Sequence, residues 1–325
     1  MHNFATCFRN WRIGSSEHVP MRRTVKLPPK FHHTNNLMGL YYILHGLSLW
    51  LGLGLSALYL WGRDDLSLVL RAPIMGALLC VSGLALNYIG TLGHEGFHGN
   101  LNKNRKLSML MGVCISSLVP FFCLMGYSLN HWKHHLYTNT DKDPDYVSFL
   151  ERQSVASKME GPRVLLWGFF CKSLQLTKTP EMVKEYKYPF KPSSVRWFAI
   201  LDVVLTLATT VGYGLFAFYH LQLFVFLIAL PYVVTSAYYT IQPYIEHAQV
   251  DLSGGDTSRS SQSWWLFAIF LGVNYHNEHH LYPSVQSHKM PALHRFLQTQ
   301  GASTAAQNTE SSFWRTLAIG AKNYY

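Results

Sequence analysis

Three short segments of this sequence concentrate histidine at spacings that suit metal binding. Residues 94–98 read HEGFH, residues 131–135 read HWKHH, and residues 276–280 read HNEHH. We refer to them as the first, second and third histidine boxes. Residues three or four apart on a helix lie on the same face, so each box can direct two or three imidazoles towards one point. Eight of the 17 histidines fall in these windows, which argues against a chance distribution of surface histidines.

The eight ring nitrogens that the boxes offer exceed what one metal ion needs. Zinc takes four ligands, and catalytic zinc keeps one position open. Eight donors therefore fit two metal ions held close together. Imidazole binds zinc, copper, iron and nickel, so the boxes alone leave the element open. The candidate ligands are His94, His98, His131, His134, His135, His276, His279 and His280.

A ninth candidate, His247, lies in the segment PYIEHAQV. It follows an apolar run just as the first box follows an earlier one, so we include it in the metal site. Several other histidines are isolated in the sequence. We expect them to be ordinary single histidines near helix ends, and they include His45, His220, His288 and His294.

The boxes lie beside long apolar runs, which must position them. The chain is 49% hydrophobic and 14% charged, against about 25% charged in an average soluble domain. Since about 20 apolar residues cross a bilayer, we predict four spans at roughly 38–61, 73–93, 197–219 and 221–241. The expected fold is an all-α integral membrane protein, with about four transmembrane helices in two hairpins and a cytosolic helical cap that carries the boxes.

The loop charges predict the orientation of these spans. Lys and Arg are abundant in residues 1–37 and 99–196, so the positive-inside rule places both segments, the C-terminal region and the boxes in the cytosol. A fifth apolar stretch, 107–129, contains Pro120. If it crossed the bilayer, the first two boxes would lie on opposite sides, so we expect it not to cross. The chain then divides into a basic cytosolic N-terminal segment (1–37), a membrane domain (38–300) and a C-terminal tail (301–325).

Several classes of function fit the sequence poorly. The net charge of +10 is spread over loops that flank apolar runs, so we expect membrane lipids rather than nucleic acid as a partner. The five cysteines show no Cys-x-x-Cys spacing, which argues against a thiolate metal site. A metal transporter would place its ligands near the bilayer midplane, whereas these lie at span ends. A non-catalytic scaffold would tolerate broken boxes, and all three are intact.

HEGFH, HWKHH and HNEHH resemble the HxxxH, HxxHH and HxxHH boxes of the membrane fatty acid desaturase superfamily. The segments HHLYTNTDKDPD and NYHNEHHLYPSV are also similar, and the resemblance covers roughly residues 38–300. It implies a non-haem di-iron oxidoreductase that uses O2 and two electrons to remove hydrogen from an unactivated C–H bond. By position, it implies that the iron ligands are the eight box histidines, with His247 matching an extra histidine of some members.

Residues near the boxes are candidates for orienting the ligands. Metal-bound histidine usually donates its second ring N–H to a carboxylate or a carbonyl. The candidates are Asp143, Asp145, Glu246, Glu278 and Asn274. Leu84, Tyr88 and Thr91 lie at helical spacing before the first box and could line a substrate tunnel, although such residues more often pack against a neighbouring helix.

The substrate and partners follow from the resemblance and the membrane setting. We expect a long apolar acyl chain, carried by a lipid, CoA or acyl carrier protein, and an external electron donor such as ferredoxin or cytochrome b5. The alternatives are an acetylenase, or a hydroxylase or ketolase of the same superfamily acting on a carotenoid or sphingolipid. The bacterial inner membrane and the endoplasmic reticulum both remain open.

Overall fold

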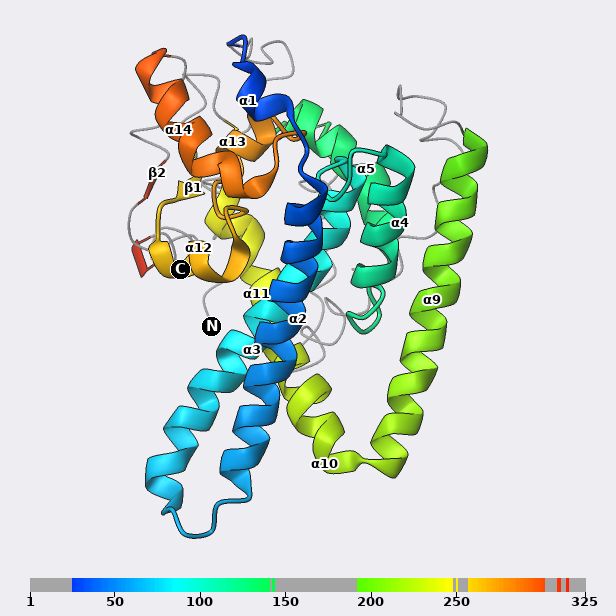
Figure 1. The fold of residues 1–325 in the computed structure, drawn as a ribbon, viewed down its shortest axis with the longest axis vertical. Coiled ribbons are helices and arrows are strands. Elements are labelled where there is room, and N and C mark those ends of the chain that lie inside the picture. The colour runs from blue at the N-terminus through cyan, green and yellow to red at the C-terminus, as the bar shows by residue number, and fades with distance from the viewer. Residues whose placement is uncertain are drawn as a thin grey trace, which may run out of the picture.

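The computed structural model describes residues 25–140, 142–143, 192–247, 250, 257–301, 309–310 and 314–315. Within these residues the fold is helical, apart from one parallel pair of two-residue strands, β1 (Ser260–Ser261) and β2 (Thr309–Glu310). Long helices extend from a cap of shorter helices (Figure 1). The long helices therefore form one part of the molecule, and the cap lies at one end of them.

Four helical segments are long and apolar enough to cross a membrane, with mean hydropathy between 1.6 and 1.9. The first two are α2 (Asn36–Trp61) and α3 (Leu68–Phe97). The third is the Ser194–Tyr219 part of α9 (Pro192–Tyr219). The fourth, Leu221–Tyr239, runs through α10 (Leu221–Phe224), the π-helical turn η3 (Val225–Ala229) and part of α11 (Leu230–His247). They form two hairpins (Figure 1), which confirms the predicted all-α membrane fold with four spans.

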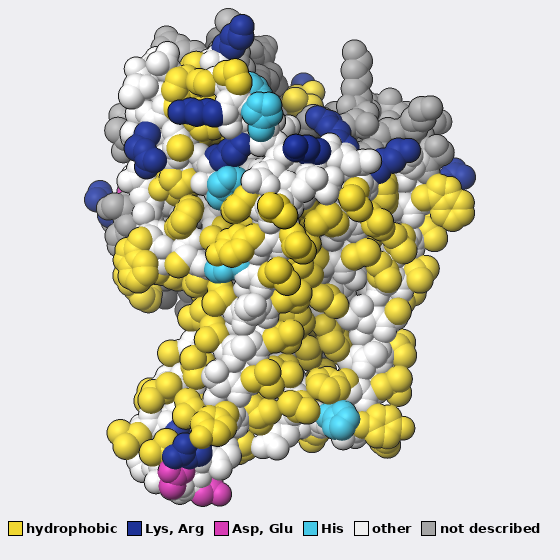
Figure 2. All heavy atoms as spheres, in the orientation of Figure 1, with side chains coloured by type: hydrophobic (Ala, Val, Ile, Leu, Met, Phe, Trp, Pro, Cys, Tyr) yellow, Lys and Arg dark blue, Asp and Glu magenta, His cyan; other side chains and the backbone are white. Residues whose placement is uncertain are grey.

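The surface of the molecule changes character where the spans meet the cap. Hydrophobic side chains cover the spans, whereas Lys and Arg gather over the cap above them (Figure 2). Trp197 near the start of α9 and Trp264 at the start of α12 are 70% and 80% exposed. Exposed tryptophans of this kind are typical of the membrane–water interface.

The fifth apolar stretch, 107–129, is not a single span. It forms α4 (Arg105–Ser116) and α5 (Leu124–Tyr137), separated by a bend that contains Pro120 and Phe121, whose φ is 58°. Proline cannot continue the helical hydrogen bonding, and the chain turns back at this point. As predicted, the second box therefore returns to the same end of the molecule as the first.

Polar side chains of α9 satisfy the backbone of this bend. Tyr213 Oη donates to the carbonyl of Leu118 at 2.6 Å, and Thr206 Oγ1 donates to the carbonyl of Phe122 at 3.0 Å. Non-helical backbone at membrane depth is tolerated only where protein groups replace the missing hydrogen bonds. The third span thus stabilises the break that brings the second box into place.

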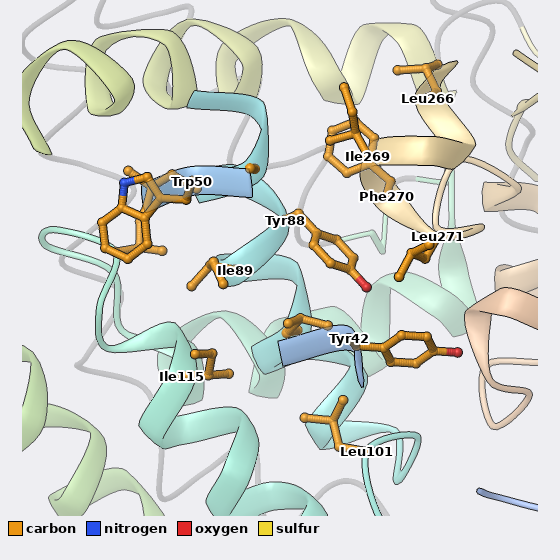
Figure 3. Packing of buried hydrophobic residues seen from close by; sticks show 14 of the residues in the cluster. Tyr42, Trp50, Tyr88, Ile89, Leu101, Ile115, Leu266, Ile269, Phe270 and Leu271 are labelled. Carbon is orange, nitrogen blue, oxygen red and sulfur yellow. The ribbon is translucent and has the colours of Figure 1, made fainter. Parts of the chain in front are cut away.

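The largest buried hydrophobic cluster joins α2, α3, α4 and α12 (Trp264–Phe270). Tyr88 of α3 packs edge-on against Phe270, and Trp50 and Ile89 extend the same cluster (Figure 3). Helices α3 and α4 approach so closely that a Cβ on Gly96 would lie 2.7 Å from the Cα of Gly112. Small residues allow such close approach between membrane helices, and here they hold α4 against the turn that carries the first box.

The cap consists of short helices around the third box. They are α1 (Pro29–His32), α12, α13 (His276–Leu281), the 3₁₀ helix η4 (Ser287–Lys289) and α14 (Met290–Thr299). Phe31 packs with Leu293 and Leu297 in a separate hydrophobic cluster. The first described residue, Val25, is hydrogen-bonded to the cap, since Tyr282 Oη donates to its carbonyl at 2.9 Å. Strand β2, in the predicted C-terminal tail, pairs with β1.

Candidate metal centre

The nine candidate histidines lie on four helix ends that meet beneath the cap. The first box closes α3, the second lies in α5, the third forms most of α13, and His247 is the last residue of α11. All nine side chains are buried. Four segments that are remote in sequence therefore contribute to one site.

The histidines form two groups, and within each group the candidate ligand atoms lie within 4.8 Å of one another. The group of five contains His94, His98, His131, His135 and His279. The group of four contains His134, His247, His276 and His280. Residues four apart stay together, as in His131 with His135 and His276 with His280. In the second and third boxes the remaining histidine, His134 or His279, belongs to the other group.

The Nε2 atoms point into each group. His94 Nε2 lies 2.8 Å from His131 Nε2, 3.0 Å from His98 Nε2 and 3.1 Å from His279 Nε2. In the group of four, His276 Nε2 lies 3.0 Å from the Nε2 atoms of both His247 and His280. Two ligand atoms each about 2.1 Å from one metal ion are roughly 3.0–3.4 Å apart at octahedral to tetrahedral angles. Both groups therefore have the spacing of ligands around a shared ion.

Three Nδ1 atoms, those of His134, His247 and His280, contact the surrounding protein. His134 Nδ1 lies 2.9 Å from Asp143 Oδ1 and 3.0 Å from Asp143 Oδ2. His280 Nδ1 lies 3.2 Å from Thr138 Oγ1, and His247 Nδ1 lies 3.4 Å from the carbonyl of Thr257. Such contacts fix the ring orientation and leave Nε2 for a metal.

Burial prepares these rings for metal binding. It lowers the pKa of His247 and of His279 to about 3, and neighbouring imidazoles add to the shift. The same causes lower the pKa well below its usual value for His98, His131, His135, His276 and His280. A histidine must be neutral to bind a metal, so these rings are ready for a metal at neutral pH.

The predicted orienting residues occupy different places. Asp143 contacts a ring of the group of four, as expected. Glu246 also approaches this group, but at His276 Nε2, where Oε2 lies 3.4 Å away. Asn274 donates to the carbonyl of Ser261 at 2.6 Å, away from the rings. Asp145 lies outside the described residues.

Glu278 and His294 form a buried pair. The sequence analysis expected Glu278 to orient a ligand histidine and His294 to be an ordinary histidine near a helix end. Glu278 Oε1 lies 2.6 Å from His294 Nδ1, and Ser260 Oγ donates to Glu278 Oε2 at 2.5 Å. His294 is 2% exposed, so its expected role as an ordinary helix-end histidine is wrong. It lies on the buried face of amphipathic α14, where it supports the third box through Glu278.

Two contributors were missed by the sequence analysis. Glu95, inside the first box, is buried, with Oε1 at 3.6 Å from His94 Nδ1 and 3.9 Å from His279 Nδ1. Asn139 adopts a left-handed conformation with φ of 63° and donates through Nδ2 to the carbonyls of His247 and Thr257. The asparagine in the TNTD sequence after the second box could have indicated a left-handed turn there, since asparagine tolerates this conformation.

The donor set fits two metal ions. Five imidazoles in one group exceed the four ligands that zinc takes, so the group of five favours a metal with a higher coordination number. No thiolate takes part among the described residues, since Cys80, Cys114 and Cys123 lie outside both groups. The arrangement can hold two metals side by side, in a buried site at the ends of membrane spans.

Comparisons with known proteins agree with this geometry. The family model described as fatty acid desaturase matches residues 70–308. One relative, the "Acyl-lipid (8-3)-desaturase" of Rebecca salina, is 27% identical over 236 residues, which cover 66% of this chain and 55% of the relative. Another, the "Omega-3 fatty acid desaturase, endoplasmic reticulum" of Vigna radiata var. radiata, is 22% identical over 272 residues, or 68% of each chain. The chain thus spans little more than half the length of the first relative. Because the family match covers most of the chain and includes all nine clustered histidines, this protein belongs to the fatty acid desaturase family.

Proposed function

We propose that this protein is an O2-dependent membrane di-iron oxidoreductase that introduces a double bond into a long acyl chain. The observation that carries the proposal is the convergence of nine buried histidines into two adjacent groups at the ends of membrane spans. We assign the group of five, His94, His98, His131, His135 and His279, to one iron. We assign the group of four, His134, His247, His276 and His280, to the other.

The chemistry requires a metal cofactor, because no protein side chain oxidises an aliphatic C–H bond. Two irons at this site would supply the activation of O2. The acyl chain loses two hydrogens, the external donor supplies two electrons and two protons arrive from water, so that O2 leaves as two water molecules. The protein holds the metals through neutral imidazoles, orients those rings through Asp143 and Thr138, and excludes bulk water by burial.

The substrate is a long acyl chain that reaches the site from the bilayer. Helix α3 runs through the membrane and ends in the first box, so a lipid chain alongside it passes close to the metals. One relative is named as an acyl-lipid desaturase. We therefore propose an acyl lipid as the first substrate to test, ahead of acyl-CoA or acyl carrier protein.

The surroundings of the site define the remaining partners. We propose that residues 38–300 form the catalytic membrane domain, flanked by the 1–37 and 301–325 segments. The cap would face the cytosol, in the endoplasmic reticulum or a bacterial inner membrane. Its Lys and Arg residues (Figure 2) offer a surface for an acidic electron donor such as ferredoxin or cytochrome b5.

The decisive experiment is a lipid profile of cells that express the protein with a compatible electron donor, oxygen and iron. Fatty acids are analysed by mass spectrometry after derivatisation that locates double bonds. We expect products lighter by two hydrogens, absent from the His279→Ala/His280→Ala variant and retained by the control His220→Ala, which alters an exposed histidine at the far turn. Products heavier by one oxygen would establish a hydroxylase instead. An unchanged acyl profile from a well-expressed protein with two irons would reject the bulk-lipid desaturase.

A further inference from the structure

We propose that Asn87, in the second span, binds a hydroxyl group on the acyl chain, so that the preferred substrate is a hydroxylated chain. The proposal rests on the desaturase function above and narrows its substrate class. Asn87 lies in α3, seven residues before His94 of the first box, and its side chain is fully buried.

The side-chain amide of Asn87 has both a donor and an acceptor without a partner. In the part of the chain that the structure describes, neither Oδ1 nor Nδ2 makes a hydrogen bond. Thr91 Oγ1 donates at 3.1 Å to the backbone carbonyl of Asn87 and leaves the amide unpaired. Buried polar groups are normally hydrogen-bonded, and an exception calls for a bound molecule or a functional role. The cost is greatest inside a membrane span, where bulk water is absent.

Asn87 lies on the face of α3 that leads to the metal centre. Residues three, four or seven apart share one face of a helix, so Asn87, Gly90 and His94 line the same side. Tyr239 of α11 approaches this side, because a Cβ on Gly90 would overlap its hydroxyl. Two polar groups, an amide and a phenol, therefore lie on the side of α3 that ends at the group of five histidines.

The position of Asn87 determines which part of a lipid can reach it. Seven helical residues correspond to about 10 Å along the axis, and Asn87 lies on the membrane side of the first box. The ester or amide of a lipid headgroup stays at the membrane surface. A partner for Asn87 must therefore be a substituent on the hydrocarbon chain itself.

The two unpaired atoms determine the chemistry of that substituent. Oδ1 accepts hydrogen bonds and Nδ2 donates them, so a complete partner needs both a donor and an acceptor. A hydroxyl group has both. A keto or epoxide oxygen only accepts and would leave Oδ1 unpaired, whereas a hydrocarbon chain, saturated or not, would leave both atoms unpaired. The amide therefore matches a hydroxylated chain best.

The unpaired amide also makes the site selective. A site built to hydrogen-bond a substrate hydroxyl discriminates against the analogue that lacks it, because buried polar groups then stay unpaired. Two hydrogen bonds of ordinary net strength correspond to roughly a ten- to hundredfold difference in affinity. In the ligand-free protein the same amide lowers stability, a cost that is typical of residues kept for function.

Matched acyl lipids test the proposal. The purified wild type and Asn87→Leu, in detergent, are titrated with stearoyl phosphatidylcholine and with positional isomers of hydroxystearoyl phosphatidylcholine. The rise in melting temperature measures binding. We expect one isomer to bind the wild type roughly ten- to hundredfold more tightly than the stearoyl lipid, and Asn87→Leu to bind both alike. With iron, oxygen and an electron donor, the same isomer should be the better substrate of the wild type.

The control variant is Ser82→Ala, which removes another fully buried polar group of α3. Ser82 Oγ already donates to the carbonyl of Trp50 at 2.7 Å, so this variant should keep the wild-type preference for the hydroxylated chain.

Equal affinity of the wild type for the stearoyl lipid and every hydroxystearoyl isomer would overturn the proposal without recourse to any variant, and would assign the Asn87 amide to bound water. A preference that Asn87→Leu retains would overturn it as well. In both cases desaturation of the stearoyl chain would leave the proposed function standing. A wild type that neither binds nor desaturates any acyl chain would instead reject the proposed function, so the two failures are distinguishable.

Discussion

Asp202, in the third span, accepts a hydrogen bond from the backbone N–H of Met125 at 2.7 Å. Met125 is the second residue of α5, whose own N-cap residue, Cys123, makes no side-chain cap. The first N–H groups of a helix need an acceptor, and inside a membrane few are available. A fully buried carboxylate of α9 therefore caps the helix that carries the second box.

This relationship predicts different effects for two substitutions of Asp202. Asp202→Leu removes the acceptor and should lower the free energy of unfolding by about 1–2 kcal/mol, as other lost caps do. Iron content should fall with it, because α5 carries three of the proposed iron ligands. Asp202→Asn keeps a side-chain oxygen and should remain close to the wild type. Thermal unfolding in detergent and metal analysis measure both effects.

Thr210→Val is the matched control, since it makes another polar residue of α9 apolar. Thr210 Oγ1 donates only within its own helix, to the carbonyl of Thr206. Equal losses of iron in Asp202→Leu and Thr210→Val would show that the cap does not position the second box.

Substitution of Asp143 should weaken metal binding by the group of four histidines. Its carboxylate lies within 3.0 Å of His134 Nδ1, and an outer partner of this kind typically changes metal affinity by about 10- to 100-fold. Asp143→Asn should therefore lose iron from the group of four at lower chelator concentration than the wild type. Asp64→Asn, at the exposed far turn between α2 and α3, serves as the control. The prediction fails if chelator titrations of Asp143→Asn and the wild type coincide.

Substitution of His294 should destabilise the protein, an effect that the sequence alone would not suggest. His294→Leu removes the 2.6 Å contact to Glu278 Oε1 and leaves a fully buried carboxylate with one partner fewer. Hydrogen bonds to charged groups are worth about 1.5–3 kcal/mol, and we expect a loss of that size by thermal unfolding. His220→Leu, in an exposed turn, should change stability little. A His294→Leu protein as stable as the wild type would exclude a structural role for the pair.

Local spacing made the clustered histidines and the spans predictable, whereas the long-range contacts were not predictable. The boxes are short helical patterns, and spans are continuous apolar runs, so both can be recognised from neighbouring residues. Even the fold-back of residues 107–129 could be predicted, because the first two boxes had to meet. The cap of α5 by Asp202 joins residues 77 positions apart, and nothing in the sequence pairs them.

The division of the histidines into two groups also required the structure. The sequence placed His131 near both His134 and His135, since three- and four-residue spacings share a helical face. In the structure the four-residue pair stays together and His134 faces the other group. Similarly, the sequence made Glu246 and Glu278 equivalent, but Glu246 lies 3.4 Å from His276 Nε2 and Glu278 pairs with His294.

Acid should destabilise the metal-free protein over a defined pH range. The folded-state pKa of His247 and of His279 is about 3, below the unfolded value of about 6.5. Between these values the unfolded chain binds more protons than the folded chain, so stability rises with pH. The melting temperature of the apoprotein should therefore be highest above pH 6.5 and fall as pH decreases towards 3. A melting temperature independent of pH from 7 to 4 would contradict the burial of neutral rings.

Asn87 gives a prediction of the opposite sign, because its removal should stabilise the protein. It lies in the second span and is 0% exposed, and among the described residues neither Oδ1 nor Nδ2 has a hydrogen-bond partner. A buried polar group without a partner costs about 1–3 kcal/mol. Asn87→Leu has a similar volume and removes both polar atoms, so it should raise the melting temperature in detergent.

The matched control for Asn87 is Ser82→Ala, on the same helix. Ser82 is also fully buried, but its Oγ donates to the carbonyl of Trp50 at 2.7 Å, so its removal should lower the melting temperature. Melting-temperature changes of opposite sign in the two variants would distinguish a buried polar group without a hydrogen bond from one that has a hydrogen bond. Since Asn87 lies seven residues before His94, roughly 10 Å along the helix and on the same face, a lower melting temperature for Asn87→Leu would mean that its amide binds water or a lipid near the metal centre.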